Sequence, residues 1–326
     1  MKDQEGYALG IDLGGTKIYA VVTAPDHRVL ARAKRSTNSE STPEETVSDM
    51  YETAMEAVAE AGLKPEDISC IGAAVPSSVD PESGECLHAV NLGWKNISLK
   101  TLLENKFGKE VILGNDANLG LLGESRCGAA KGFRSAVGYF IGTGLGGAII
   151  IDGALHLGQK GTAGEFGHCT VRAGGRRCGC GKRGCLEAYC SKVAFVKALK
   201  KEVFKRGETT MLPEDKFNES SRNIKSKYLA RAYKNEDPPV RKVIDKGLRM
   251  LGVGAASICA AIAPECIVIG GGVAESLGEN LLPPFMASFQ KHLFGIEPED
   301  VVIRLSVLGD DAVAVGATLL ARGTES

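Results

Sequence analysis

The chain has 326 residues, of which 44% are hydrophobic and 24% charged, and its formal net charge is -1. That composition is typical of a soluble globular protein, and the length suits two domains better than one. The balanced charge argues against a basic surface for nucleic acid or for an anionic membrane. No stretch approaches the roughly 18 uninterrupted apolar residues of a membrane span, and the first residues do not resemble a signal peptide. We therefore expect a protein of the reducing cytoplasm.

The first part of the chain predicts a hairpin followed by alternating strands and helices. Residues 7–12 and 18–23 are typical of buried strands, and the glycine turn at 13–17 joins them directly without a helix. A helix is expected from Pro43, with Ser41 or Thr42 as its N-cap. The other elements expected here are strands at 29–33, 68–75 and 111–115 and helices at 43–61 and 116–125.

The second part repeats the hairpin pattern and then becomes helical. A strand at 136–141, a glycine turn at 142–147 and a return strand at 148–151 indicate an internally duplicated architecture. A polar helical region follows at 192–249, and its charged middle, 207–227, is expected to be an exposed excursion. The remaining elements expected are an apolar helix at 248–263, a buried strand at 266–269 and a last helix at 312–322. Alternating strands and helices predict an α/β protein with at least two sheets.

One imidazole and three thiols between residues 168 and 187 predict a structural zinc site. The expected ligands are His168, Cys178, Cys180 and Cys185. Thiolate and imidazole suit zinc, and four protein ligands leave no open position for chemistry. The alternative is a disulfide or ordinary buried cysteines, which a reducing compartment and the strain of a bridged Cys-x-Cys disfavour. Seven cysteines lie outside the motif, and most of them are expected to be small buried hydrophobes: Cys70, Cys86, Cys127, Cys169, Cys190, Cys259 and Cys266.

The glycine clusters indicate contacts with phosphate. Gly142-x-Gly144-x-x-Gly147 matches the dinucleotide fingerprint in letters only, because a β-branched run follows it where that fingerprint needs a helix. Each glycine turn alone is an ordinary hairpin or a cradle in which main-chain N–H groups approach phosphate oxygens. Two such turns and the triplet at 270–272 together favour a nucleotide. The candidate residues are Asp12, Gly14, Gly15, Thr16, Lys17, Gly142, Thr143, Gly144, Gly271 and Gly272.

Four acidic residues are placed where chemistry is expected. Asp12 ends a buried strand, and magnesium on nucleotide phosphates would give its carboxylate a partner. Asp116 also follows a strand, where it either takes part in catalysis or caps the helix that begins there. Glu165 and Glu187 flank the zinc motif, either as rigidly held ligands for a polyhydroxylated molecule or as a solvated surface pair.

Five motifs occur in an order that resembles the ROK family of repressors and sugar kinases, over nearly the whole chain. They are Asp12-Leu13-Gly14-Gly15-Thr16-Lys17, Asn115-Asp116-Ala117-Asn118 with Gly123-Glu124, Gly142–Gly147, Glu165-Phe166-Gly167-His168, and the cysteine segment through Glu187. With Asn91-Leu92-Gly93-Trp94 added, the chain is most similar to the bacterial glucokinases of that family. The resemblance implies an actin-like, hexokinase-type ATPase fold of two α/β domains with a cleft between them. The expected small domain is 1–118 plus 305–326, and the large domain is 119–304 with the zinc segment 168–187.

The same resemblance implies an ATP-dependent hexose kinase, with glucose as the expected substrate, ATP with Mg²⁺, and a structural Zn²⁺. Asp116 would accept the proton of the 6-hydroxyl as it attacks the γ-phosphate. Sugar hydroxyls would be bound by Asn91, Asn115, Asp116, Glu165, His168 and Glu187. The expected assembly is a homo-oligomer, a dimer or tetramer, with no nucleic acid and no membrane as partner.

Other members of the family remain as alternatives. The sequence does not separate glucose from mannose, fructose, N-acetylmannosamine or N-acetylglucosamine. Two departures from the family pattern occur. Ala148 stands where many relatives carry glycine, which is a mild change. Pro76-Ser77-Ser78 stands where many carry Pro-Gly or a related small pair, and this departure touches the sugar side. A sugar-responsive repressor is the remote alternative, disfavoured because only eleven residues precede Asp12 and the chain is not basic.

Overall fold

The computed structural model describes residues 6–38, 41–80, 83–84, 86–89, 94–221 and 224–324. The chain forms two units. The first comprises Met1–Ser135, Ala148–Gly164 and Asp310–Ser326, and the second comprises Ala136–Gly147 and Glu165–Gly309.

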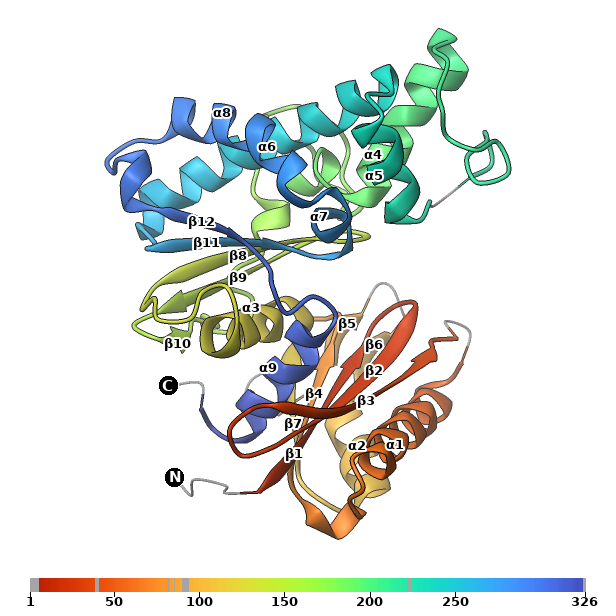
Figure 1. Cartoon of the computed structure of the whole chain (residues 1–326), viewed down its shortest axis with the longest axis vertical. Helices are drawn as coiled ribbons and strands as arrows, with labels where there is room; N and C mark the ends of the chain where they lie inside the picture. The colour runs from red at the N-terminus through yellow and green to blue at the C-terminus, as the bar shows by residue number, and fades with distance from the viewer. Residues whose placement is uncertain are drawn as a thin grey trace. The chain divides into compact units, whose positions relative to one another are not determined.

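The first unit is built on a five-stranded sheet of order β3-β2-β1-β4-β7 (Figure 1). The strands are β1 (Tyr7–Leu13), β2 (Lys17–Thr23), β3 (Val29–Ser36), β4 (Ile68–Val75) and β7 (Val111–Asn115). β1 pairs antiparallel with β2, which confirms the predicted first hairpin, and parallel with β4, which in turn pairs parallel with β7. The carboxyl ends of β1, β4 and β7 therefore lie along one edge of the sheet. A separate two-stranded ribbon joins β5 (Cys86–Ala89) to β6 (Trp94–Ile97).

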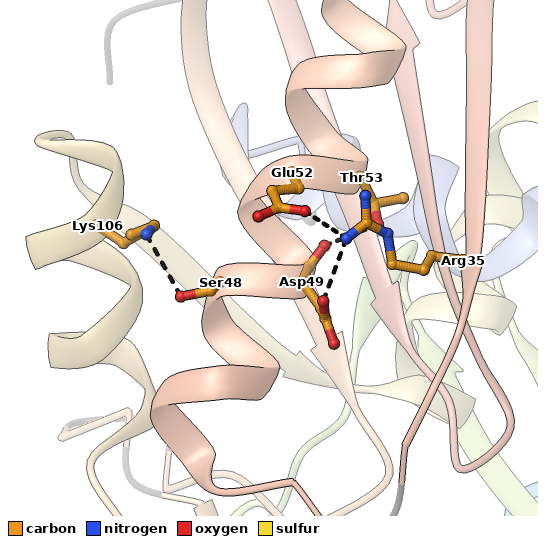
Figure 2. Close-up of polar contacts among 6 residues, drawn as sticks. All are labelled: Arg35, Ser48, Asp49, Glu52, Thr53 and Lys106. Atoms are coloured by element: carbon orange, nitrogen blue, oxygen red, sulfur yellow. Dashed lines mark hydrogen bonds and ion pairs between the residues drawn. The ribbon is translucent and has the colours of Figure 1, made fainter.

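Helices α1 (Pro43–Glu60) and α2 (Leu99–Phe107) cover one face of this sheet, sharing a core with alternate residues of β1 and β2. Thr42 caps the N-terminus of α1 and forms a capping box with Glu45, which confirms Thr42 as one of the two predicted caps. Figure 2 shows how α1 is tied to its neighbours: Arg35 of β3 pairs with Asp49 at 3.2 Å and with Glu52, and Lys106 of α2 donates to Ser48 at 3.4 Å. These contacts lie at the surface and contribute little energy. The helix α1 is held mainly by the packing of its apolar face.

Helices α3 (Asp116–Cys127) and α9 (Asp311–Ala321) pack over the opposite face, against Tyr19 and Val21 of β2. The two helices touch backbone to backbone. A Cβ on Gly316 would lie 1.8 Å from the carbonyl oxygen of Leu119, and one on Gly123 would lie 2.3 Å from that of Ala312. Glycine is required at both positions because no side chain fits between the helices.

This packing accounts for the division of the chain. The expected boundary at 118 falls inside α3, whereas the first unit continues to Ser135 and resumes with Ala148–Gly164 and Asp310. A helix that packs tightly on α9 cannot be assigned to a different unit from α9.

The second sheet has the order β10-β9-β8-β11-β12 (Figure 1). Its strands are β8 (Ala136–Ile141), β9 (Leu145–Ile151), β10 (Ala154–Leu155), β11 (Cys266–Gly270) and β12 (Val302–Leu305). β11 pairs parallel with both β8 and β12. The second predicted hairpin is present, but its return strand begins at Leu145 instead of 148. The turn is shorter because the amide of Gly142 already bonds to the carbonyl of Gly144 at 3.0 Å.

The helices of the second unit are α4 (Lys192–Lys200), α5 (Ser226–Lys234), α6 (Pro238–Ile262), α7 (Gly272–Leu277) and α8 (Leu282–His292). A π-helical turn extends α4 over Lys201–Lys205, and short 3₁₀ turns lie at Pro65–Asp67, Phe166–His168, Leu186–Ala188, Gly278–Leu281 and Pro298–Asp300. Among the described residues, no helix has the length and apolar character that crossing a membrane requires.

Two expectations for this unit were wrong in part. The apolar helix expected at 248–263 begins at Pro238, because Asp237 caps it through the amide of Val240 at 3.2 Å. The stretch expected to be an exposed excursion is anchored, since Leu212, Phe217 and Ile224 are buried at 6%, 2% and 3% exposure.

Candidate active site and metal centre

The first glycine turn holds Asp12 and Lys17 at the carboxyl edge of the first sheet. Asp12 lies near the end of β1 and Lys17 begins β2. The amide of Gly14 closes the turn on the carbonyl of Lys17 at 2.9 Å. Thr37 braces the turn from both sides: its amide donates to Thr16 O at 3.1 Å and its hydroxyl to Gly14 O at 2.8 Å. Thr37 was missed in the sequence because nothing in its neighbours marks it.

Asp12 lies within electrostatic reach of Asp116. Burial and then the negative charge of Asp116 raise the pKa of Asp12 to about 7, with Lys17 opposing the shift and Asp310 adding to it. The parallel strands explain this proximity, because β1 ends at Leu13 and α3 begins just after β7 at the same edge. A carboxyl group poised in this way is a frequent feature of functional sites.

The cap of α3 is Asn115 and not Asp116. The Asn115 Oδ1 accepts the amide of Asn118 at 3.1 Å, while its Nδ2 donates to Ser77 O at 3.2 Å. Asp116 Oδ1 accepts from the Ala117 amide at 2.8 Å and from Asn115 Nδ2 at 3.1 Å. The alternative left open by the sequence is thereby resolved against a capping role for Asp116. Its carboxylate is oriented by two hydrogen bonds in the first turn of a helix, where negative charge is stabilised.

Two aspartates at the start of α9 complete this cluster of the first unit. The ammonium of Lys17 pairs with Asp310 at 2.5 Å and lies 5.1 Å from the centroid of the Tyr19 ring. Tyr19 donates to Asp311 at 2.7 Å, and Arg32 donates to both Asp311 oxygens, at 2.9 and 2.6 Å. Although burial opposes it, hydrogen bonds from Arg32 and Tyr19 lower the pKa of Asp311.

The predicted zinc ligands come together in the second unit. The ligand atoms of His168, Cys178, Cys180 and Cys185 all lie within 4.8 Å of one another. Cys180 Sγ is 3.7 Å from Cys185 Sγ, and Cys178 Sγ is 3.8 Å from His168 Nδ1. A tetrahedral ion with Zn–S bonds of about 2.3 Å separates its sulfur ligands by roughly 3.8 Å, so the donor set and spacing fit zinc.

A tight backbone loop shapes this cluster. The amide of Cys178 bonds to the carbonyl of Lys182 at 2.9 Å, and Gly184 has a φ of +88°. A Cβ on Gly184 would lie 1.9 Å from the carbonyl oxygen of Arg172, so glycine is required there.

Glu187 links the cysteine cluster to the second glycine turn. Its Oε2 accepts the amide of Leu145 at 3.1 Å, and its Oε1 lies 3.5 Å from Cys178 Sγ. A Cβ on Gly144 would lie 2.5 Å from Oε2, which explains the glycine. Glu165 and His168, by contrast, are exposed. The side chain of Glu187 is thus held in place within its own unit.

The two glycine segments of the second unit are neighbours. Gly271 follows β11 with a φ of +86°, and a Cβ there would lie 2.8 Å from the backbone of Ile141, just before the turn at Gly142. Gly272 begins α7. The carbonyls of Gly142 and Thr143 accept the amides of Lys192 and Val193 at 3.0 and 3.3 Å.

The remaining predicted residue, Asn91, lies outside the described residues. The motifs did not point to four residues that contact the first glycine turn or its neighbours: Arg32, Thr37, Asp310 and Asp311. The adjacent acidic pair at 310–311 was visible in the sequence only as the start of a helix.

Comparisons with known proteins agree with these features. The model of the ROK family matches residues 8–324. A glucokinase of Halalkalibacterium halodurans is 31% identical over 98% of this chain and 96% of its own length. A crystal structure of a ROK family glucokinase from Streptomyces griseus, in complex with glucose and AMPPNP, has a TM-score of 0.85 at 33% identity and covers 98% of this chain and 100% of that one. A xylose repressor of Caldicellulosiruptor bescii is 30% identical over 95% of this chain and 77% of its own length.

Two mixed sheets flanked by helices, with a glycine turn after the first strand of each hairpin, define the actin-like, hexokinase-type ATPase fold. The chain belongs to the ROK family.

Proposed function

We propose that the protein is an ATP-dependent hexose kinase that phosphorylates the 6-hydroxyl of glucose. The observation that carries the proposal is the Asp116 carboxylate, which does not cap its helix and is oriented by Ala117 and Asn115 beside Asp12. It stands in a chain that is 31% identical to a glucokinase over nearly the full length of both.

Asp116 would act as the general base. It would accept the proton of the attacking hydroxyl, and its fixed orientation supplies the alignment on which phosphoryl transfer mostly depends. Asn115 holds Asp116 through its Nδ2 and is itself held by Ser77 O, so the Pro76–Ser78 departure reaches the proposed base through two hydrogen bonds that share this nitrogen.

The phosphates of ATP would be held by the glycine segments, with Lys17 and Thr143 as side-chain donors. Mg²⁺ bound with ATP neutralises phosphate charge, and Asp12 is the carboxylate proposed to face it. A cation would offset the burial and the neighbouring negative charges that raise the pKa of Asp12.

Contacts to sugar hydroxyls are assigned to Asn91, Asn115, Glu165, His168 and Glu187. His168 turns Nδ1 toward Cys178, which leaves the opposite ring nitrogen for a hydroxyl group. The cysteine cluster would bind a structural Zn²⁺ through His168, Cys178, Cys180 and Cys185, cross-linking the segment that carries Glu187. We also propose a homo-oligomer working in the cytoplasm, which light scattering and cell fractionation can check.

The test is a coupled ADP-release assay with purified protein on glucose, mannose, fructose, N-acetylglucosamine and N-acetylmannosamine. Glucose should give the highest kcat/KM, because a site built around particular hydroxyls discriminates against analogues that leave its polar groups unpaired. A higher value for an acetamido sugar would overturn glucose as the substrate and leave the hexose kinase in place. Absence of turnover with every sugar would overturn the kinase.

The similarity to a xylose repressor supports a second candidate, a sugar-responsive DNA-binding protein. Fluorescence anisotropy with duplex DNA separates the two. Salt-sensitive, sequence-specific binding without sugar phosphorylation would favour the repressor.

A further inference from the structure

The ammonium of Lys17 is held on two sides within the first unit. Asp310 Oδ1 lies 2.5 Å from Lys17 Nζ, and the Tyr19 ring centroid lies 5.1 Å from it. The side chains of Lys17 and Asp310 are 34% and 66% exposed, so the pair can be reached from solvent. Lys17 is also the residue of the first glycine turn that the proposed function assigns to ATP phosphates.

The two adjacent aspartates have different partners. Arg32 donates to both oxygens of Asp311, and the Tyr19 hydroxyl donates to the same carboxylate. The charge of Asp311 is therefore neutralised by a guanidinium, and the ring beside Lys17 is fixed. The carboxylate of Asp310 instead forms an ion pair with Lys17.

The electrostatic balance around Lys17 is unfavourable for an incoming anion. Asp116 and Asp310 both act on the carboxyl of Asp12, with Lys17 as the opposing cation. A phosphate that approaches Lys17 must share the lysine ammonium with Asp310. It is also repelled by the negative charge of the Asp310 carboxylate.

From this geometry we infer that Asp310 is a positioning residue that competes with nucleotide phosphates for Lys17 and thereby weakens ATP binding. The inference rests on the phosphate-binding role proposed for Lys17. An aspartate paired with a phosphate-binding lysine lowers the nucleotide affinity, so that ADP leaves more readily after transfer. Exposed ion pairs are weak, which lets ATP displace Asp310 without a large change in structure.

The primary experiment is ATP binding by isothermal titration calorimetry with Mg²⁺ and without sugar. Asp310→Asn keeps the shape and removes the charge, and it should tighten the Kd for ATP by about three- to tenfold. Asp26→Asn is the matched control. It removes one negative charge from the exposed turn at the other end of β2, and it should change the Kd by less than about twofold.

A double-mutant cycle with Lys17→Ala separates competition for Lys17 from a structural effect. Lys17→Ala should weaken ATP binding, and Asp310→Asn should then have less than about twofold effect in that background.

An unchanged or weaker ATP affinity in folded Asp310→Asn protein would overturn the inference, as would an equal gain in the Lys17→Ala background. Unchanged ATP affinity in Lys17→Ala would overturn it as well, by removing the role of Lys17. These measurements use nucleotide alone. A failure of the proposed kinase would show instead as absent sugar turnover with ATP binding intact.

Discussion

The hydroxyl of Tyr19 donates to the carboxylate of Asp311 at 2.7 Å, although the two residues are 292 positions apart in the chain. The bond joins the second strand of the first unit to the first residue of its last helix. Burial and this bond to Asp311 raise the pKa of the Tyr19 phenol. The hydroxyl therefore remains protonated, and a donor, across the working pH range.

Tyr19→Phe should lower the free energy of unfolding by about 0.5–1.5 kcal/mol, the usual net contribution of one hydrogen bond. Asp311 keeps its two bonds from Arg32, so the carboxylate is not left buried and unpaired. Urea unfolding measures the change. Tyr7→Phe on the neighbouring strand β1 is the matched control, and an equal loss there would contradict a specific role for the Tyr19 bond.

Asp116→Asn should reduce kcat by about 10²- to 10⁴-fold, because an amide keeps the shape and cannot accept the proton. The melting temperature should change little, since Asn115 and not Asp116 caps α3. A coupled assay and a thermal melt on the same preparation check both statements. The assignment is wrong if the variant retains more than about a tenth of the original kcat.

Cys185→Ser should abolish zinc binding and activity together, because it removes one of four ligands from a buried corner of the cluster. Elemental analysis should find about one zinc per chain in the native protein and none in the variant. Cys169→Ser is the control, since Cys169 is exposed and outside the ligand set. A fully active Cys185→Ser enzyme would refute a structural metal.

Glu187→Gln should lower kcat/KM for glucose while zinc content and ATP affinity are preserved. The amide oxygen of glutamine can still accept from Leu145, so the turn should hold its shape. Metal analysis, ATP titration and sugar kinetics on one preparation test the three parts. Loss of zinc in this variant would show that Glu187 mainly supports the cysteine cluster.

The raised pKa of Asp12 predicts that the stability of the protein depends on pH. Its pKa is raised from 3.8 in the unfolded chain to about 7 in the fold. Between these values the folded protein holds a proton that the unfolded chain has released, so Asp12 lowers stability progressively as pH rises from about 4 to about 7. Asp12→Asn should remove this penalty.

Urea unfolding of the nucleotide-free protein at pH 5 and pH 8 tests that dependence. The stability of Asp12→Asn relative to the original protein should be greater at pH 8 than at pH 5. Asp26→Asn, in an exposed turn, should show no such difference. A pH-independent offset for Asp12→Asn would contradict the raised pKa.

Local sequence patterns predicted most of the helices and strands. The errors concern element boundaries and caps that depend on the folded backbone. The hairpins, the capped helix at Thr42 and the cluster of one histidine and three cysteines follow from neighbours in sequence. The start of α6 was placed too late because its first turns were included in the polar helical region at 192–249, and the buried cap at Asp237 that separates them was not recognised. Which of two adjacent Asx residues caps α3 depends on backbone angles that the sequence does not contain.

The site was predictable where a motif is continuous and unpredictable where it is assembled from distant segments. Lys17 follows from the first glycine turn, but its pairing with Asp310 depends on how α9 packs. The extent of the first unit also depends on distant segments, since the close contact of Gly316 with Leu119 joins parts of the chain far apart in sequence.

That contact also bears on how the protein is made. Helix α9 covers one face of the first sheet, and its backbone meets that of α3 at Gly316 against Leu119 and at Ala312 against Gly123. The strands of that sheet leave the ribosome early and α9 among the last segments, so the apolar face at Tyr19 and Val21 waits uncovered during translation. A chaperone that binds nascent chains would find its target on this sheet, and a nonsense mutation ahead of residue 311 would leave that target permanently exposed.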